Sequence, residues 1–237
     1  MSLPAHLSIP DFDEWGLRAF TTTRRAGSFG TNSQESAAEA LGRWGSLAEA
    51  VAEAGVARFA SAVQVHGDNV RIHERAWTGW LRCTGVDGHA WMRPGMAAAV
   101  TIADCVPVFI AHPSGAGALL HSGWKGTAAS ITEVAIGAFR RAGFGAASLR
   151  IHLGPSICGS CYEVSPEVFS AVTGSTVVKP SLLDLRASIA GRAHALGVND
   201  IAVSEWCTRC SNDQLFSHRA GDSGRQLGVL ISPQRIT

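Results

Sequence analysis

The chain has 237 residues, of which 46% are hydrophobic and 16% are charged, and its formal net charge at pH 7 is +1. It is long enough to bury a substantial core, and no apolar run approaches the roughly 18 to 20 uncharged residues that a membrane helix needs. The net charge is near zero and no block of like charges occurs, so the sequence lacks the basic surface expected of a protein that binds nucleic acid or an anionic membrane. A small-molecule partner is therefore favoured.

The first predicted elements lead to a histidine at the end of a strand. Residues 1–16 lack the basic start, apolar stretch and cleavage site of a secretory signal, so we expect a cytoplasmic protein. Apolar residues at helical spacing over 33–54 predict one amphipathic helix, or two helices broken near Gly45. The short apolar run at 59–67 then predicts a strand that delivers His66.

A cysteine occupies a second predicted strand end. Residues 76–95 are rich in glycine and other turn residues and predict a loop. Strands are predicted over 97–105 and 107–113, with a break at Asp104 and Cys105.

The next strand ends at another histidine. The buried-type run at 118–121 predicts a strand that stops at His121, and two glycines lead into a helix predicted over 127–142. The remaining predicted elements are strands over 148–154, 200–204 and 226–231 and helices over 165–172 and 181–196.

The order of these elements predicts the fold class. Strands alternate with helices, but several connections are too short for parallel crossovers. We therefore predict an α/β protein of the mixed α+β kind, with mixed β-sheets flanked by helices in a single domain that spans residues 1–237.

Three of the predicted strand ends carry metal-competent side chains, namely His66, Cys105 and His121. Strand ends are places where segments far apart in sequence converge on a site. Two imidazoles and a thiolate suit zinc or copper, and three protein ligands leave a position open for chemistry. Taken singly, each histidine is also compatible with an ordinary polar residue at a strand end.

Six segments occur in an order that resembles one protein family. They are TTRRAGS (22–28), QVHG (64–67), ADCVPV (103–108), HSGWKG (121–126), GPSICGSCYEV (154–164) and FSHRAGDSGR (216–225). Together they resemble the multicopper polyphenol oxidoreductase (laccase) domain family, also described as laccase-domain purine nucleoside phosphorylases, to which the bacterial proteins YfiH and YlmD belong. The resemblance covers nearly the whole chain and implies a YfiH-like fold.

The resemblance also implies ligands and activities. It makes His66, Cys105 and His121 the metal ligands, with zinc as the cofactor and copper as the alternative. The implied substrates are phosphate and a purine nucleoside such as adenosine, inosine or methylthioadenosine, and deamination of adenosine is a further implied activity. An older assignment in the family is copper-dependent oxidation of phenols.

Phosphorolysis requires a phosphate pocket, and four residues are candidates for binding substrate or phosphate. Arg24 and Arg219 each offer a planar, permanently charged fork. Lys125 lies just before the predicted helix at 127–142, where free backbone N–H groups favour an anion. Gln64, the first residue of QVHG, is the fourth candidate. For each cation the alternative is a solvated surface position.

Asp104, next to Cys105, is the candidate catalytic residue, either as a proton carrier or as a partner that fixes a histidine tautomer. The chain departs from the family pattern in two places. The region after Arg24 is shortened, and Asn32 is expected to keep the role of an asparagine found there in relatives. At VDGHA, Asp87 is a weak candidate, and His89 is an extra imidazole expected to be structural or solvent-facing.

The cysteines allow other interpretations. Two CxxC pairs, Cys158 with Cys161 and Cys207 with Cys210, could form a structural four-thiolate zinc site. The two helices predicted between the pairs are unlike a small zinc ribbon and argue against this.

Cys105 could also be the nucleophile of a hydrolase, with His121 as its base. Laccase-type oxidation is disfavoured because the HxH and HxxxH patterns of multicopper sites are missing, and only one copper is easy to place. A metal-dependent interaction module without catalysis also remains open.

Overall fold

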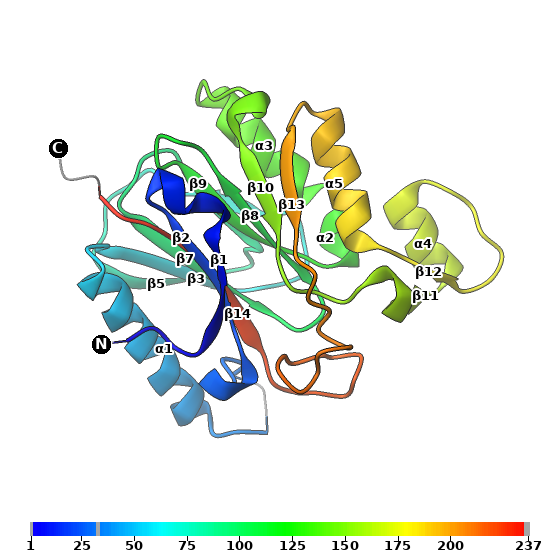
Figure 1. Cartoon of the computed structure of the whole chain (residues 1–237), viewed down its shortest axis with the longest axis horizontal. Coiled ribbons are helices and arrows are strands. Elements are labelled where there is room, and N and C mark those ends of the chain that lie inside the picture. Colours follow the sequence, from blue (N-terminus) through cyan, green and yellow to red (C-terminus); the bar gives the residue numbers. More distant parts are fainter. Residues whose placement is uncertain (1, 32–33, 235–237) are drawn as a thin grey trace.

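Two mixed β-sheets of six strands each form the centre of the molecule (Figure 1). The structure is a computed structural model that describes residues 2–31 and 34–234, so Asn32 lies outside the described residues. The first sheet has the strand order β1 (His6–Ile9), β2 (Arg18–Thr22), β14 (Gln226–Ser232), β7 (Met96–Ile102), β3 (Arg58–Val63) and β5 (Gly79–Thr84). The second has the order β13 (Asp200–Val203), β10 (Arg150–Leu153), β8 (Val106–Ala111), β9 (Gly117–Ser122), β6 (Gly88–Trp91) and β4 (Val70–Ile72).

Parallel and antiparallel pairs occur in both sheets. In the first sheet, β3 runs parallel to β5 and β7, whereas β14 runs antiparallel to β2 and β7. In the second, β10 runs parallel to β13 and antiparallel to β8. A short antiparallel ribbon is formed by β11 (Glu163–Val164) and β12 (Ser181–Leu182). The prediction of a mixed α/β fold with mixed sheets flanked by helices is therefore confirmed.

Strand β7 shows why the sheets pack face to face. Side chains alternate across a strand with a period of two residues. The even-numbered residues from Met96 to Ile102 belong to the core between the sheets, together with Phe109 of β8. Ala97 and Ala99 point the other way and pack with the helix α1 (Ala37–Glu53). Because β7 is apolar on both faces, it lies between two cores.

Helices cover the outer faces of both sheets. Helix α1 covers the first sheet, and the other helices lie on the far side of the second sheet (Figure 1). These helices are α2 (Trp124–Ala128), α3 (Ile131–Arg141), α4 (Pro166–Thr173) and α5 (Leu185–Ala195). The 3-10 helices are η1 (Pro10–Trp15), η2 (Arg24–Ala26), η3 (Ala146–Ser148) and η4 (Gly159–Cys161). Within the described ranges, no helix combines the length and hydrophobicity required to cross a bilayer.

Three predicted helices differ from the observed ones, and the last, predicted over 181–196, is shortened to α5 because residues 181–182 form β12. The first begins at Ala37 and passes through Gly45 without a break. The helix predicted over 127–142 is instead a pair, α2 and α3, separated at Ser130, whose φ of 68° is incompatible with a continuous right-handed helix. The early start of α2 places Lys125 inside its first turn rather than before a helix.

The prediction of a loop over 76–95 is wrong, because this segment contains the strands β5 and β6. Its glycines and aspartate are typical of turns, but the strands between them are held by partners distant in sequence. Strand β5 pairs along its whole length with β3, and β6 pairs with β9. Tertiary pairing thus overrides local turn propensity here.

Candidate metal and substrate site

His66, Cys105 and His121 converge where strands of the two sheets end. Because β3 and β7 are parallel neighbours, they end at the same edge, and His66 follows β3 while Cys105 lies in the turn between β7 and β8. His121 is on β9, which pairs with β8. One ligand atom from each of the three residues lies within 4.8 Å of the others. The structure therefore brings together the three side chains that the sequence analysis selected.

Asp87, fully buried between β5 and β6, organises this cluster. Its Oδ1 accepts hydrogen bonds from the backbone N–H of His66 and from Nδ1 of His121, both at 2.9 Å. Its Oδ2 accepts the N–H groups of Val65 and Gly67, at 3.1 and 2.8 Å. One carboxylate thus holds the backbone that carries the first histidine and the ring of the second.

The hydrogen bond from Nδ1 of His121 to Asp87 leaves Nε2 of His121 available as a ligand. This is the arrangement in which a carboxylate fixes the tautomer of a metal-binding imidazole. His66 has a positive φ of 62°, an uncommon backbone conformation for a residue other than glycine, and the three hydrogen bonds of its segment to Asp87 hold it there. The ring of His66 meets that of His121 edge to face, with centroids 4.8 Å apart.

The electrostatics of the cluster favour a thiolate. Burial raises the pKa of Cys105, but the positive charge and hydrogen bond of His121, with those of His66, outweigh burial and lower this pKa to about 6. Burial lowers the pKa of His121, but the Cys105 thiolate and Asp87 raise it to about 9. A deprotonated sulfur between two imidazoles is the form of cysteine that binds a metal ion.

The residues present fit a zinc or copper ion by two observations. The donor set is one thiolate and two imidazoles, which suits either ion. His121 is buried, Cys105 is half-buried and His66 is exposed, so the cluster is open to solvent on one side. Gly123, in the HSGWKG segment, is required for this closeness, because a Cβ at this position would lie 2.7 Å from Sγ of Cys105.

The open side of the cluster faces a cavity of roughly 640 Å³, a size typical of small-molecule sites. Lys125, Arg219 and Arg82 line it, and among the described residues none of these three cations forms an ion pair with a carboxylate. Trp124 and Tyr162 contribute aromatic surface. The pocket is thus positively charged next to the cluster and can receive an anion together with an aromatic ring.

Three of the four candidate binding residues line this pocket. Lys125 is exposed, with Nζ 5.6 Å from the centroid of Trp124. The guanidinium of Arg219 stacks 4.9 Å from the centroid of Tyr162 and donates to the carbonyl of Glu163.

Gln64 also lines the pocket, but its amide is engaged with Thr101. Its Oε1 accepts the N–H and the hydroxyl of Thr101, and its Nε2 donates to the carbonyl of Thr101. We therefore assign Gln64 to the support of the pocket wall rather than to the binding of substrate.

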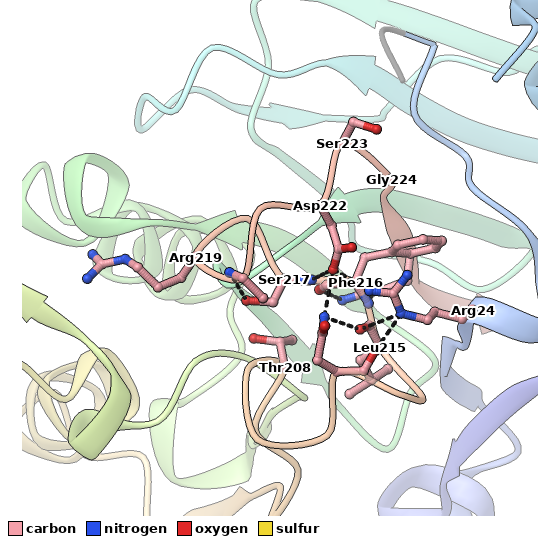
Figure 2. Close-up of polar contacts among 12 residues, drawn as sticks. Arg24, Thr208, Leu215, Phe216, Ser217, Arg219, Asp222, Ser223 and Gly224 are labelled. Atoms are coloured by element: carbon pink, nitrogen blue, oxygen red, sulfur yellow. Dashed lines mark hydrogen bonds and ion pairs between the residues drawn. The ribbon is translucent and has the colours of Figure 1, made fainter. Parts of the chain in front are cut away.

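Arg24, the fourth candidate, does not reach the pocket. Its guanidinium forms an ion pair with Asp222, donates to the carbonyls of Asn212 and Leu215, and stacks on Phe216. These partners belong to the loop at 212–222, and Figure 2 shows Arg24 and Arg219 on opposite sides of it. Because Nε and Nη2 of Arg24 are engaged and its guanidinium stacks on Phe216, we leave Arg24 out of the phosphate site and assign it to holding the loop at 212–222.

Asp104 lies in the pocket wall, but both carboxylate oxygens are occupied. Oδ1 accepts the hydroxyl of Thr208 at 2.6 Å, and Oδ2 accepts the backbone N–H of Arg219 at 2.7 Å. The expected role of fixing a histidine tautomer therefore belongs to Asp87 rather than to Asp104. In this structure Asp104 positions Arg219.

A second group of two histidines and one cysteine lies elsewhere in the protein. The ligand atoms of His73, Cys83 and His89 lie within 4.8 Å of one another, and the sequence analysis did not single out this group. However, Nε2 of His73 and Nδ1 of His89 bond to each other at 3.0 Å, and the charge of Arg71 opposes a further cation there. His89 is fully buried, so it is structural and not solvent-facing.

Sequence reasoning undervalued Asp87 and missed Arg82 and Tyr162. Asp87 was only a weak candidate, from its place in VDGHA, where the chain departs from the family pattern, and the turn-rich segment at 76–95 predicted a loop. Arg82 lies on β5, inside the same segment. Tyr162 follows the first CxxC pair, and only the fold brings it to the pocket.

Comparisons with known proteins relate the chain to one family. Residues 22–232 match the family described as multi-copper polyphenol oxidoreductase laccase. Purine nucleoside phosphorylase SCO2081 of Streptomyces coelicolor is 35% identical over 178 residues, 70% of this chain and 72% of that protein. Adenosine deaminase RL5 of an unknown prokaryotic organism is 32% identical over 149 residues, 57% of each chain. The crystal structure of YlmD from Geobacillus stearothermophilus matches with a TM-score of 0.85 at 26% identity, covering 99% of this chain and 98% of that one.

Proposed function

This chain belongs to the multi-copper polyphenol oxidoreductase laccase family, and from that premise we propose that it is a metal-dependent purine nucleoside phosphorylase. The family resemblance inferred from the six ordered segments is confirmed by the match over 22–232. The relative SCO2081, named a purine nucleoside phosphorylase, supports the choice of reaction. The proposed substrates are phosphate and adenosine, inosine or methylthioadenosine.

One observation carries this proposal: the metal-competent cluster and the unpaired cations share one pocket. His66, Cys105 and His121 would hold the ion, and a bound zinc ion supplies Lewis acidity at this wall of the cavity. Lys125 and Arg219, which line the same pocket, are the proposed phosphate ligands, because charge-assisted hydrogen bonds to phosphate are about twice as strong as neutral ones.

The proposed reaction exchanges one bond for another at the ribose. A phosphate oxygen attacks C1′ while the bond from C1′ to the base nitrogen breaks, and its electron pair leaves with the base, which takes up a proton. The products are the free base and the corresponding sugar phosphate, which is ribose 1-phosphate from adenosine or inosine and methylthioribose 1-phosphate from methylthioadenosine. The half-buried Trp124 and the cation-stacked Tyr162, which both line the pocket, provide aromatic surface for the purine ring. Burial and the nearby Cys105 charge raise the pKa of Tyr162 to about 12, so its hydroxyl stays protonated and can donate a hydrogen bond.

The test is incubation of purified, metal-loaded protein with each of the three nucleosides, with and without phosphate. We expect the free base and the matching sugar 1-phosphate only when both phosphate and bound metal are present. Elemental analysis of the native protein, before any metal is added, distinguishes zinc from copper. Inertness toward all three nucleosides, or oxidation of phenols by a copper-loaded sample alone, would overturn the proposal.

Lysine variants test the phosphate site directly, because the chain contains only two lysines, Lys125 and Lys179. Lys125→Met removes one charge-assisted contact of about 1.5 to 3 kcal/mol, so we expect the KM for phosphate to rise roughly tenfold to a hundredfold. Lys179 is exposed and outside the pocket, so Lys179→Met is the matched control with unchanged kinetics. An unchanged KM in both variants would remove Lys125 from the site.

Deamination of adenosine is a second proposed activity, supported by the relative RL5, which is named an adenosine deaminase. Release of ammonia and inosine from adenosine, independent of phosphate, measures it. The cysteine-hydrolase alternative is tested by alkylation: a metal ligand at Cys105 is protected in the metal-loaded protein and reactive in the apo protein, whereas a nucleophile reacts rapidly in both.

A further inference from the structure

The two CxxC pairs form a four-sulfur cluster. Cys158, Cys161, Cys207 and Cys210 are all free cysteines, and their sulfur atoms lie within 4.8 Å of one another. The two pairs are 49 residues apart along the chain. The helices predicted between them are present as α4 and α5, yet they do not separate the pairs, because they pack on the second sheet and return the chain to the cluster.

The spacing of the sulfur atoms fits tetrahedral zinc. Four sulfur atoms at about 2.3 Å from a zinc ion stand about 3.8 Å from one another. In this structure Sγ of Cys161 and Sγ of Cys210 are 3.4 Å apart, and every pair in the cluster lies within the 4.8 Å limit. Two sulfur atoms in a disulfide would be near 2.0 Å instead, so the arrangement is a four-way cluster rather than two closed pairs.

Backbone N–H groups point at one of the sulfur atoms. Sγ of Cys207, which is buried, accepts the N–H of Cys158 at 3.3 Å and the N–H of Cys210 at 3.5 Å. Hydrogen bonds of this kind stabilise a thiolate, and the second comes from the cysteine three positions later in the same CxxC turn. The backbone is therefore arranged for a charged sulfur, which is the ligand form for zinc.

We propose that Cys158, Cys161, Cys207 and Cys210 bind a second, structural zinc ion, separate from the cluster of His66, Cys105 and His121. Four protein ligands fill the coordination sphere of zinc, so this ion is closed to substrate and holds the fold. The proposal is independent of the proposed nucleoside reaction, because it concerns different residues and is measured without substrate.

The second zinc ion also explains how one wall of the pocket is held. Thr208, directly after Cys207, donates its hydroxyl to Asp104, and its N–H bonds to the carbonyl of Ser156 at 3.1 Å. Tyr162, directly after Cys161, lines the pocket. The ion therefore joins two loops, 154–164 and 204–225, that carry the pocket residues and have few regular strand contacts of their own.

The first experiment is metal analysis of the native chain and its variants, purified with reductant and dialysed. We expect two zinc ions per wild-type chain and one in Cys105→Ser. The double variant C158S with C207S should retain one ion, and combining it with Cys105→Ser should leave none. Ser175→Ala, at an exposed position outside the cluster, is the control and should retain two. A double variant that keeps the wild-type content would overturn the proposal.

Cobalt substitution of the wild-type chain keeps the test decisive even if the double variant fails to fold. Four thiolates give cobalt an intense thiolate-to-metal charge-transfer absorption, whereas one thiolate with two imidazoles gives a much weaker one. We expect the four-thiolate spectrum in wild-type and in Cys105→Ser protein. A spectrum with only the weak component, or a disulfide between Cys161 and Cys210 in protein that contains no zinc at this cluster, would refute the second site.

Discussion

The substitution Asp87→Asn tests whether one buried carboxylate organises the metal cluster. The carboxylate accepts four hydrogen bonds, two on each oxygen, from His121 and from the backbone of residues 65–67. An amide has the same shape but offers one acceptor atom and one NH₂ donor. In either orientation, the NH₂ group faces two donors that lose their acceptor.

The expected cost follows from that count. Each hydrogen bond to a charged group contributes about 1.5 to 3 kcal/mol, so two lost bonds should lower the free energy of unfolding by roughly 3 to 6 kcal/mol. If the NH₂ group faces His121, this ring loses the partner that keeps its proton on Nδ1, and Nε2 becomes a poorer ligand. Removing such a partner lowers metal affinity roughly tenfold to a hundredfold.

Two assays separate these effects. Urea unfolding of the metal-free protein measures the free energy of unfolding, and competition with a chromophoric chelator measures zinc affinity. Asp68→Asn is the matched control, because Asp68 is exposed and only two residues from His66. If Asp87→Asn unfolds at the same urea concentration and binds zinc as tightly as the control, Asp87 does not orient the cluster and our interpretation is wrong.

Two further predictions concern packing and pH. Gly123→Ala places a Cβ 2.7 Å from Sγ of Cys105, so zinc affinity in the chelator assay should fall roughly tenfold. Gly191→Ala is the control, because nothing lies within 4 Å of a Cβ at that position, and it should leave zinc affinity unchanged. Burial lowers the pKa of His73 to about 4 and of His89 to about 3, from 6.5 in the unfolded chain. At pH values between the folded pKa and 6.5, the unfolded chain binds more protons at these histidines than the folded protein does. The free energy of unfolding should therefore fall by about 2 kcal/mol per histidine from pH 8 to pH 5. His121, whose pKa is raised to about 9, contributes with the opposite sign, so the measurement compares wild type with His89→Gln; the same pH dependence in both would contradict this.

Local sequence was enough to predict most of the regular elements. Alternating or continuous apolar residues indicated the strands observed as β3, β7, β8, β9, β10, β13 and β14, because buried strands need apolar side chains on one or both faces. The strands β5 and β6 were predicted as a loop, because their short runs are set among turn residues and gain their stability from β3 and β9.

The same division applies to the candidate site. Residue type and position at strand ends were enough to select His66, Cys105 and His121, and the ordered segments were enough to indicate the family. The part of Asp87 in the site was not predictable, because a hydrogen bond between β9 and the turn before β6 depends on how the strands pair. Arg24 and Lys125 were equally plausible phosphate ligands until the fold paired the first with Asp222 and left the second unpaired in the pocket.

The amino-acid sequence by itself determined which side chains are chemically able to bind a metal ion and which segments are apolar enough to form the sheets, since both are properties of residue type and local spacing. Only the tertiary structure decided which polar groups meet. His121 and Asp87 are 34 positions apart, and the two CxxC pairs are 49 positions apart. Whether such residues meet depends on how the chain crosses itself, which local periodicity does not encode.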